Sequence, residues 1–218
     1  MTTASQVAGY AGSMETVAWS KPEPERAGTP LLVMLHGYGT DETRMARLFD
    51  SLPHEFTCAA PRAPKVIGDD YGWFLLDYFL THDFADVISA TNSVFTWIDS
   101  VKGQHSSVSL LGYSQGMAMA STLLRLHPEA FRAVVGLSGF VLDNELLAMS
   151  ESFDARPPFF WGRDKNDAVI NDAATAHTEE WLHAHTQLTA RSYPGIGHSI
   201  SKAELVDVSA FLRHYVLR

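Results

Sequence analysis

The stretch from Val108 to Phe131 constrains the fold of this chain more than any other part of the sequence. It begins with an apolar run, VSLL, typical of a buried parallel strand, and ends with an amphipathic run at helical spacing. Between them, GYSQG places Ser114 in a turn where Gly112 and Gly116 let strand and helix pass closely. This succession predicts an α/β fold with a mostly parallel central sheet flanked by helices.

The same letters suggest chemistry at Ser114. In a G-x-S-x-G turn the serine hydroxyl is lifted to the carboxyl edge of the sheet, and the helix N-terminus behind it favours developing negative charge. An ordinary Gly-Ser turn is the alternative. The strand-to-helix context favours the interpretation as a nucleophile, with Ser114 as the reacting group.

Bulk composition limits the class of protein. The 218 residues are 46% hydrophobic and no linker-like stretch divides them, so we expect one domain over residues 1–218. The net charge of -9 argues against nucleic acid or an anionic membrane as partner. No apolar run reaches the roughly 18 residues that span a bilayer, and the first residues do not resemble a signal peptide. We therefore expect neither a leader nor stable membrane insertion.

The single cysteine, Cys58, lies in the apolar segment FTCAAP. It cannot form an intramolecular disulfide, and a buried structural thiol is a better interpretation than a nucleophile. This cysteine usage is consistent with a cytoplasmic protein.

Short apolar runs alternate with segments of helical periodicity along the chain. METVAW predicts an antiparallel edge strand, and Leu31–Leu35 a buried parallel strand. The further expected strands are FTCAAP, AVVGLSG, PPFFWGR and LTARSYPG, and the further expected helices begin near Thr40 or Asp41, Asp83, Asp143, Asn171 and Ser201.

The loop HGYG follows the strand Leu31–Leu35. Its glycines allow a backbone N–H to approach a reacting carbonyl without a Cβ in the way. We expect the N–H groups of Tyr38 and Gln115 to form an oxyanion hole. His36, at the strand end, is interpreted as a structural hydrogen-bonding group.

A proline-punctuated loop running to about Thr81 carries a dense set of aromatic residues. Loops at the carboxyl edge of a parallel sheet form binding crevices, so part of this segment is expected to line a substrate pocket. Trp73 and Phe74 are the first choices as substrate-binding residues. The alternative is that these aromatic side chains cover the core.

A serine nucleophile needs a base and an orienting acid, which should follow later strands. His198, in GIGHS after the last expected strand, can take and return the serine proton. The segment WGRDKNDAVIN offers Asp164, Asp167 and Asp172. Asp167 is preferred as the acid, and Asp164 stays open as the alternative. His183 and His185 lack a third ligand, so no metal is expected.

Several motifs in order resemble the phospholipase/carboxylesterase family of serine hydrolases, which includes acyl-protein thioesterases. They are HGYGTDE from His36, PRAP from Pro61, the Trp73-Phe74 pair, GYSQGM from Gly112, DAVI from Asp167 and GIGH ending at His198. The resemblance runs from about Leu31 onward. It implies an α/β-hydrolase fold without a large cap domain and ester hydrolysis through Ser114, Asp167 and His198. It also implies that no cofactor is needed and that a homodimer is possible.

The sequence departs from the family pattern in three places: the acid motif, the elbow and the residue after the histidine. In the acid motif, Trp161 replaces a histidine and Asn171 replaces a proline. Two extra residues also stand before Asp167. Met117 replaces a small residue, and Ser199 an acidic one. The expected function is a serine carboxylesterase acting on short- to medium-chain esters through an acyl-enzyme on Ser114. A thioesterase or lysophospholipase with the same triad, and a non-catalytic ligand-binding protein, are the alternatives.

Overall fold

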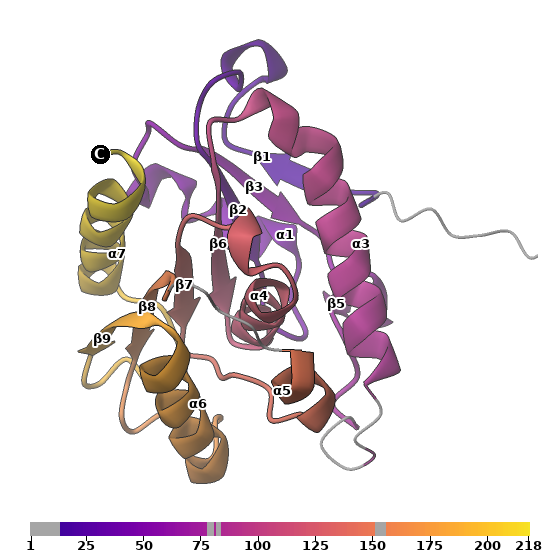
Figure 1. Cartoon of the computed structure of the whole chain (residues 1–218), viewed down its shortest axis with the longest axis vertical. Helices are drawn as coiled ribbons and strands as arrows, with labels where there is room; N and C mark the ends of the chain where they lie inside the picture. The colour runs from indigo at the N-terminus through magenta and orange to yellow at the C-terminus, as the bar shows by residue number, and fades with distance from the viewer. Residues whose placement is uncertain (1–13, 78–80, 82–83, 151–155) are drawn as a thin grey trace, which may run out of the picture.

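In a computed structural model that describes residues 14–77, 81, 84–150 and 156–218, seven of the described strands form one sheet. Its order is β1-β3-β2-β6-β7-β8-β9 (Figure 1). The strands are β1 Val17–Trp19, β2 Leu31–Leu35, β3 Thr57–Pro61, β6 Val108–Tyr113, β7 Val134–Leu137, β8 Pro158–Arg163 and β9 Gln187–Ser192. All neighbours pair in parallel except β1, which runs antiparallel to β3 at one edge. The mostly parallel sheet and the antiparallel edge strand were both predicted.

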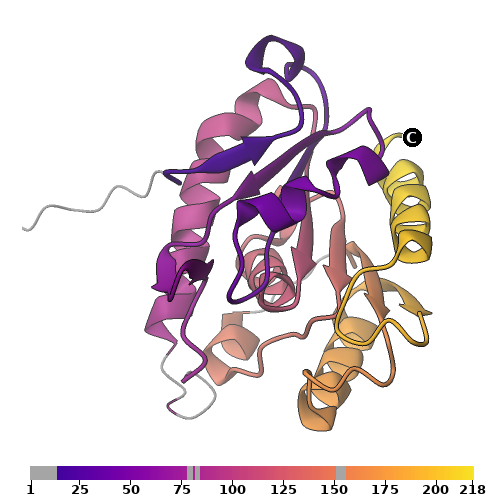
Figure 2. The same cartoon turned by 180° about the vertical axis from the view of Figure 1, so that it is seen from behind.

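Helices cover both faces of this sheet. Helices α3 Ala85–Val101, α4 Gln115–Leu126, α5 Glu145–Ser150 and α6 Asp172–His185 lie on one face, and α1 Glu42–Ala46 and α7 Lys202–Val216 lie on the other (Figures 1 and 2). Side chains of β2 alternate between the two layers: Leu31 and Val33 belong to the core under α3 and α4, and Leu32 belongs to the core under α7. The continuous apolar runs of the sequence are therefore strands buried on both faces.

The helix ends follow local sequence signals. The Asp41 side chain accepts the N–H of Thr43 at the start of α1, and Asn171 accepts that of Ala174 at the start of α6. Helix α7 begins with a capping box between Ser201 and Glu204. Each of these caps lies within two residues of the start expected from the sequence.

Close contact between β6 and α4 explains the glycines around Ser114. A Cβ on Gly112 would collide with the carbonyl of Gly116, and a Cβ on Gly116 would collide with that of Leu35. The larger Met117 fits because Gly136 and Gly139 stand against its side chain, where a Cβ would also collide. The departure at Met117 is therefore absorbed by two neighbouring glycines.

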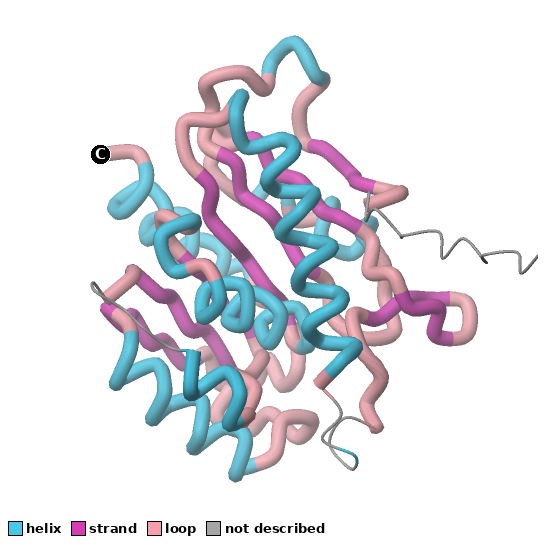
Figure 3. The backbone as a smooth tube through the Cα atoms, turned by 45° about the vertical axis from the view of Figure 1, so that its right-hand side comes forward, coloured by secondary structure: helices cyan, strands magenta, loops and turns pink. Residues whose placement is uncertain are grey.

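The segment expected to be a loop after Pro61 contains a small second sheet. Strands β4 Lys65–Ile67 and β5 Asp70–Gly72 pair antiparallel around Gly68, whose φ is 62°. Figure 3 shows this pair beside the main sheet. It is joined to the HGYG loop because Gly39 donates to the Tyr71 carbonyl and Tyr71 donates to that of Thr40. The expectation of a continuous loop was wrong at this point.

The described helices include none that combines the length and the apolar character needed to cross a membrane.

Candidate active site

Ser114 sits at the junction of β6 and α4. Its φ of 54° and ψ of -120° are unusual for a residue with a Cβ. The turn is held because the Ser114 N–H donates to the Leu137 carbonyl at 2.9 Å and the Ser114 carbonyl accepts the N–H of Met117 at 2.9 Å. This backbone places the hydroxyl at the carboxyl edge of the sheet, which lies at the bottom of Figure 1.

A chain of two hydrogen bonds runs from Ser114 through His198 to Asp167. His198 Nε2 lies 2.9 Å from Ser114 Oγ, and His198 Nδ1 lies 2.7 Å from Asp167 Oδ2. The Asp167 side chain is 5% exposed and that of His198 is 18% exposed. An ionised carboxylate only accepts, so the proton belongs on Nδ1, and Nε2 is free to accept the serine proton.

The structure thus brings together three residues that the sequence had selected. Asp167 follows β8, and its other oxygen, Oδ1, accepts the Val169 N–H at 2.8 Å. Asp164 is only 2% exposed and does not contact the His198 ring nitrogens, because both of its oxygens accept backbone N–H groups. Asp172 is exposed at the first position of α6.

Two further side chains hold the backbone around His198. The Tyr113 hydroxyl donates to the His198 carbonyl at 2.8 Å, and Ser138 Oγ donates to the Ser199 carbonyl at 3.1 Å. Burial raises the pKa of Tyr113, so this donor stays protonated. Neither residue was predicted from the sequence. Tyr113 stands inside GYSQG, but its partner lies 85 residues away and no local pattern reveals it.

The HGYG loop passes beside the serine. A Cβ on Gly37 would lie 3.3 Å from Ser114 Cβ, so Gly37 is in near contact with the elbow. In the part of the chain that the structure describes, the N–H groups of Tyr38 and Gln115 have no protein acceptor. Both are thus available to a ligand, as an oxyanion hole requires.

His36 is a structural residue, as the sequence analysis expected. It is fully buried, its Nε2 accepts the Ala63 N–H at 3.0 Å, and its Nδ1 lies 2.8 Å from the Gly37 carbonyl. Nδ1 therefore carries the proton. Burial lowers the pKa of His36, which keeps the ring neutral.

Trp73 and Phe74 lie in the interior, where neither side chain has exposed surface. The Gln115 side chain holds this pair, since its Oε1 accepts the Trp73 N–H at 2.8 Å and its Nε2 donates to the Phe74 carbonyl at 2.7 Å. Trp73 Nε1 also donates to the His36 carbonyl at 2.8 Å. A ligand could touch either ring only if neighbouring residues moved, so their placement favours the alternative that they cover the core. Their contacts brace the HGYG loop, through the His36 carbonyl, and the Gln115 side chain.

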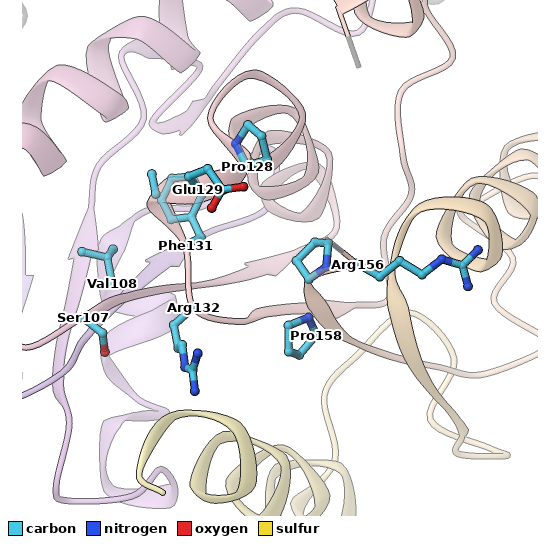
Figure 4. Close-up of a pocket in the computed structure, with 10 residues that line it drawn as sticks. Ser107, Val108, Pro128, Glu129, Phe131, Arg132, Arg156 and Pro158 are labelled. Carbon is cyan, nitrogen blue, oxygen red and sulfur yellow. The ribbon is translucent and has the colours of Figure 1, made fainter. Parts of the chain in front are cut away.

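A surface cavity of about 490 Å³ lies away from these residues (Figure 4). It is lined by Ser107, Val108 and Pro158, among others, at the amino ends of β6 and β8. Ser114 follows the carboxyl end of β6. The cavity is therefore at the opposite edge of the sheet and is not the pocket that serves Ser114.

The other titratable candidates are placed apart from the site. Cys58 is buried in β3, and burial raises the pKa of its thiol to about 12. His183 is exposed, and His185 stacks on Trp181 with ring centroids 5.1 Å apart. Among the described residues, no group of three or more His, Cys, Asp or Glu side chains could hold a metal ion.

Comparison with known proteins gives consistent matches. The model of the phospholipase/carboxylesterase family matches residues 21–216. A probable carboxylesterase of Oryza sativa subsp. japonica is 26% identical over 206 residues, which cover 85% of this chain and 77% of the relative. Acyl-protein thioesterase 1 of Candida albicans is 27% identical over 177 residues, which cover 72% of this chain and 75% of the relative.

Solved structures agree with the fold. Esterase PE8 superposes with a TM-score of 0.72 at 26% identity, covering 87% of this chain and 94% of that structure. A variant of SOBER1 from Arabidopsis thaliana gives a TM-score of 0.76 at 21% identity, covering 87% of this chain and 100% of that structure, and it shows the fold alone. With the family model spanning nearly the whole sheet and its helices, the chain belongs to the phospholipase/carboxylesterase family of α/β-hydrolases.

Proposed function

We propose that this protein is a serine esterase that hydrolyses carboxylic esters through an acyl-enzyme on Ser114. The observation that carries the proposal is the unbroken hydrogen-bond chain from Asp167 through His198 to Ser114. The family match and the relatives named carboxylesterase support the same reaction. The proposed chemistry uses side chains and backbone N–H groups of this protein together with a water molecule.

In the first half-reaction, Ser114 Oγ attacks the ester carbonyl carbon while His198 Nε2 accepts the hydroxyl proton. The imidazolium that forms is stabilised by the Asp167 carboxylate at Nδ1. The carbonyl oxygen becomes an oxyanion, and the N–H groups of Tyr38 and Gln115 are its proposed donors. Collapse of this intermediate expels the alcohol, which takes the proton from His198, and leaves an acyl-serine.

In the second half-reaction, water attacks the acyl-serine from the side of His198. Nε2 now accepts a proton from water, and the same donors hold the second oxyanion. When this intermediate collapses, the Ser114 oxygen regains a proton from His198 and the carboxylic acid leaves. Ser114 and His198 are thereby restored.

The direct test is substitution of the nucleophile. Ser114→Ala should lower kcat on a p-nitrophenyl ester by about 10⁶-fold, since the other triad members cannot act without the nucleophile. A fluorophosphonate probe should label the unaltered protein at Ser114 and leave the variant unlabelled. Ser93→Ala, at a half-buried position of α3, is the matched control and should keep full activity. Wild-type turnover by Ser114→Ala would overturn the mechanism.

Short- to medium-chain esters are the proposed substrates. A thioesterase or lysophospholipase is the second candidate, favoured by the relative named acyl-protein thioesterase 1. The triad serves either reaction, so the acyl pocket decides between them. Relative kcat/KM on p-nitrophenyl esters of increasing length, on matched thioesters and on a lysophospholipid separates these activities.

A non-catalytic ligand-binding protein is the remaining alternative. Failure of the fluorophosphonate probe to react with folded protein would favour it over both enzymes. We also propose a cytoplasmic location, supported by the single buried thiol, which fractionation of the producing cells would test. Light scattering would test the homodimer that the family resemblance allows.

A further inference from the structure

Asp164 is a buried carboxylate that the proposed reaction does not use. It stands just after β8 and is 2% exposed. Its Oδ1 accepts the N–H of Asn166 at 2.9 Å, and its Oδ2 accepts the N–H groups of Gly195 at 2.7 Å and Gly197 at 3.0 Å. Three backbone donors on one carboxylate favour its ionised form. These hydrogen bonds, led by that from Asn166, lower the pKa of Asp164.

The donors belong to the two loops that carry the acid and the base. Asn166 immediately precedes Asp167, and Gly197 immediately precedes His198. The φ angles of Gly195 and Gly197 are 88° and 57°, and this left-handed backbone brings both N–H groups to the same oxygen. One side chain therefore bonds to both loops within one residue of each reacting group.

We propose that Asp164 is a positioning residue that fixes the distance and angle between Asp167 and His198 by clamping their two loops together. This inference rests on the proposed role of Ser114, His198 and Asp167 in ester hydrolysis. Asp164 does not act as the triad acid, because the His198 Nδ1 partner is Asp167 and both Asp164 oxygens are taken by N–H donors.

An amide cannot replace this carboxylate. Asparagine has nearly the same shape, but one of its two terminal groups is an NH₂ donor. In Asp164→Asn that NH₂ must face either the Asn166 N–H or the pair from Gly195 and Gly197. Each arrangement sets donor against donor and releases one of the two loops.

The experiment compares Asp164→Asn with Asp50→Asn, which alters an exposed carboxylate on η2 Phe49–Ser51. For each protein, kcat and KM are measured on a p-nitrophenyl ester, with active sites counted by fluorophosphonate titration. The low-field proton resonance of the His198 to Asp167 hydrogen bond is recorded by NMR. Thermal unfolding reports whether each variant is folded.

Asp164→Asn should lower kcat per active site by about 10²-fold with KM nearly unchanged, since misplacement of a catalytic group by about 1 Å has that effect. The low-field resonance should be lost or broadened, whereas Asp50→Asn should keep both properties. A folded Asp164→Asn with kcat within twofold of the unaltered protein and an intact resonance would refute the clamp. So would a rise in KM with kcat unchanged.

If Asp164→Asn does not fold, Asp164→Glu decides, because its carboxylate keeps all acceptors but is displaced by one methylene. Lower kcat with a shifted resonance supports the clamp, and wild-type values for both refute it. The result is separable from the test of the reaction itself. If Ser114→Ala retains turnover, the proposed function fails; if only Asp164→Asn behaves as the unaltered protein, the clamp alone fails.

Discussion

Ser114 holds a backbone conformation that costs about 1–3 kcal/mol for a residue with a side chain. Its φ of 54° and ψ of -120° lie in a region that glycine enters freely. The bonds from its N–H to Leu137 and from Met117 to its carbonyl keep it there. This geometry lifts the hydroxyl toward His198, so the conformation that is unfavourable for stability is the one that the reaction uses.

Stability measurements on two inactive variants would report this strain. Ser114→Gly and Ser114→Ala both lack the hydroxyl, but only alanine keeps a Cβ at positive φ. We expect Ser114→Gly to be the more stable by about 1 kcal/mol in urea unfolding. An alanine variant as stable as the glycine variant, or more so, would argue against strain at this position.

The Tyr113 hydroxyl offers a single-atom test of how His198 is held. Tyr113→Phe removes the hydroxyl that donates to the His198 carbonyl and keeps the ring. Since such a bond contributes about 0.5–1.5 kcal/mol, kcat should fall by up to about tenfold with KM unchanged. Tyr215→Phe, near the end of α7, is the control and should match the unaltered protein. Equal kcat in all three proteins would show that this hydrogen bond does not align the base.

At the scale of elements, the start of α7 contains a buried acid close to the site. Glu204 is fully buried, its Oε2 accepts the Ser201 N–H at 3.3 Å, and its Oε1 has no partner among the described residues. Burial raises the pKa of Glu204 to about 7, and nearby Asp207 adds to the effect. Helix α7 begins four residues after His198. The Glu204 carboxyl group therefore caps the helix directly after the loop that carries His198.

The raised pKa of Glu204 predicts a pH-dependent stability. An unfolded glutamate has a pKa near about 4.3. Between that value and about 7 the folded chain keeps a proton that the unfolded chain has lost. The contribution of protonated Glu204 to the free energy of unfolding is therefore complete at low pH. It declines by up to about 1.4 kcal/mol per pH unit as pH rises through this window, and it levels off above the window.

The measurement is urea unfolding from pH 4.5 to 8 for the unaltered protein and for Glu204→Gln, which cannot titrate. As pH rises, the unfolding free energy of the unaltered protein should fall relative to that of Glu204→Gln. Other carboxylates titrate equally in both proteins and cancel. A difference that is flat with pH would mean that Glu204 has an ordinary pKa in the folded chain.

Sequence periodicity predicted the strands and helices of the main sheet because each carries an apolar pattern longer than one turn or pleat. The β4 and β5 pair was not predicted, because each strand has only three residues. The pair is also held by hydrogen bonds of Tyr71 with Gly39 and Thr40, which periodicity does not show. The GYSQG turn between a strand and a helix led to Ser114, and chain order then led to Asp167 and His198. It could not reveal the use of Asp164, since two of its three partners lie 31 and 33 residues away, nor the placement of Trp73, whose N–H donates to Gln115, 42 residues along the chain.

At the scale of the molecule, the site is assembled from loops that follow β2, β6, β8 and β9. These strands lie across most of the sheet's width, and no two of the triad residues come from one element. The site can therefore exist only when the sheet is complete. We expect it to be lost in the same transition as the core.

Parallel denaturation curves would test this coupling. Tryptophan fluorescence reports the core, since four tryptophan residues are at most 7% exposed: Trp73, Trp97, Trp161 and Trp181. Esterase activity and fluorescence should be lost at the same urea concentration, as in a two-state transition. Activity that disappears well before the fluorescence change would mean that the histidine loop opens while the sheet remains folded.

The separation between nucleophile and base has a consequence during synthesis. Ser114 leaves the ribosome 84 residues ahead of His198, and strands β7, β8 and β9 are made in between. A nascent chain thus carries the hydroxyl through 84 residues of elongation without the imidazole that would activate it. Catalysis can begin only once translation has passed the last strand of the sheet.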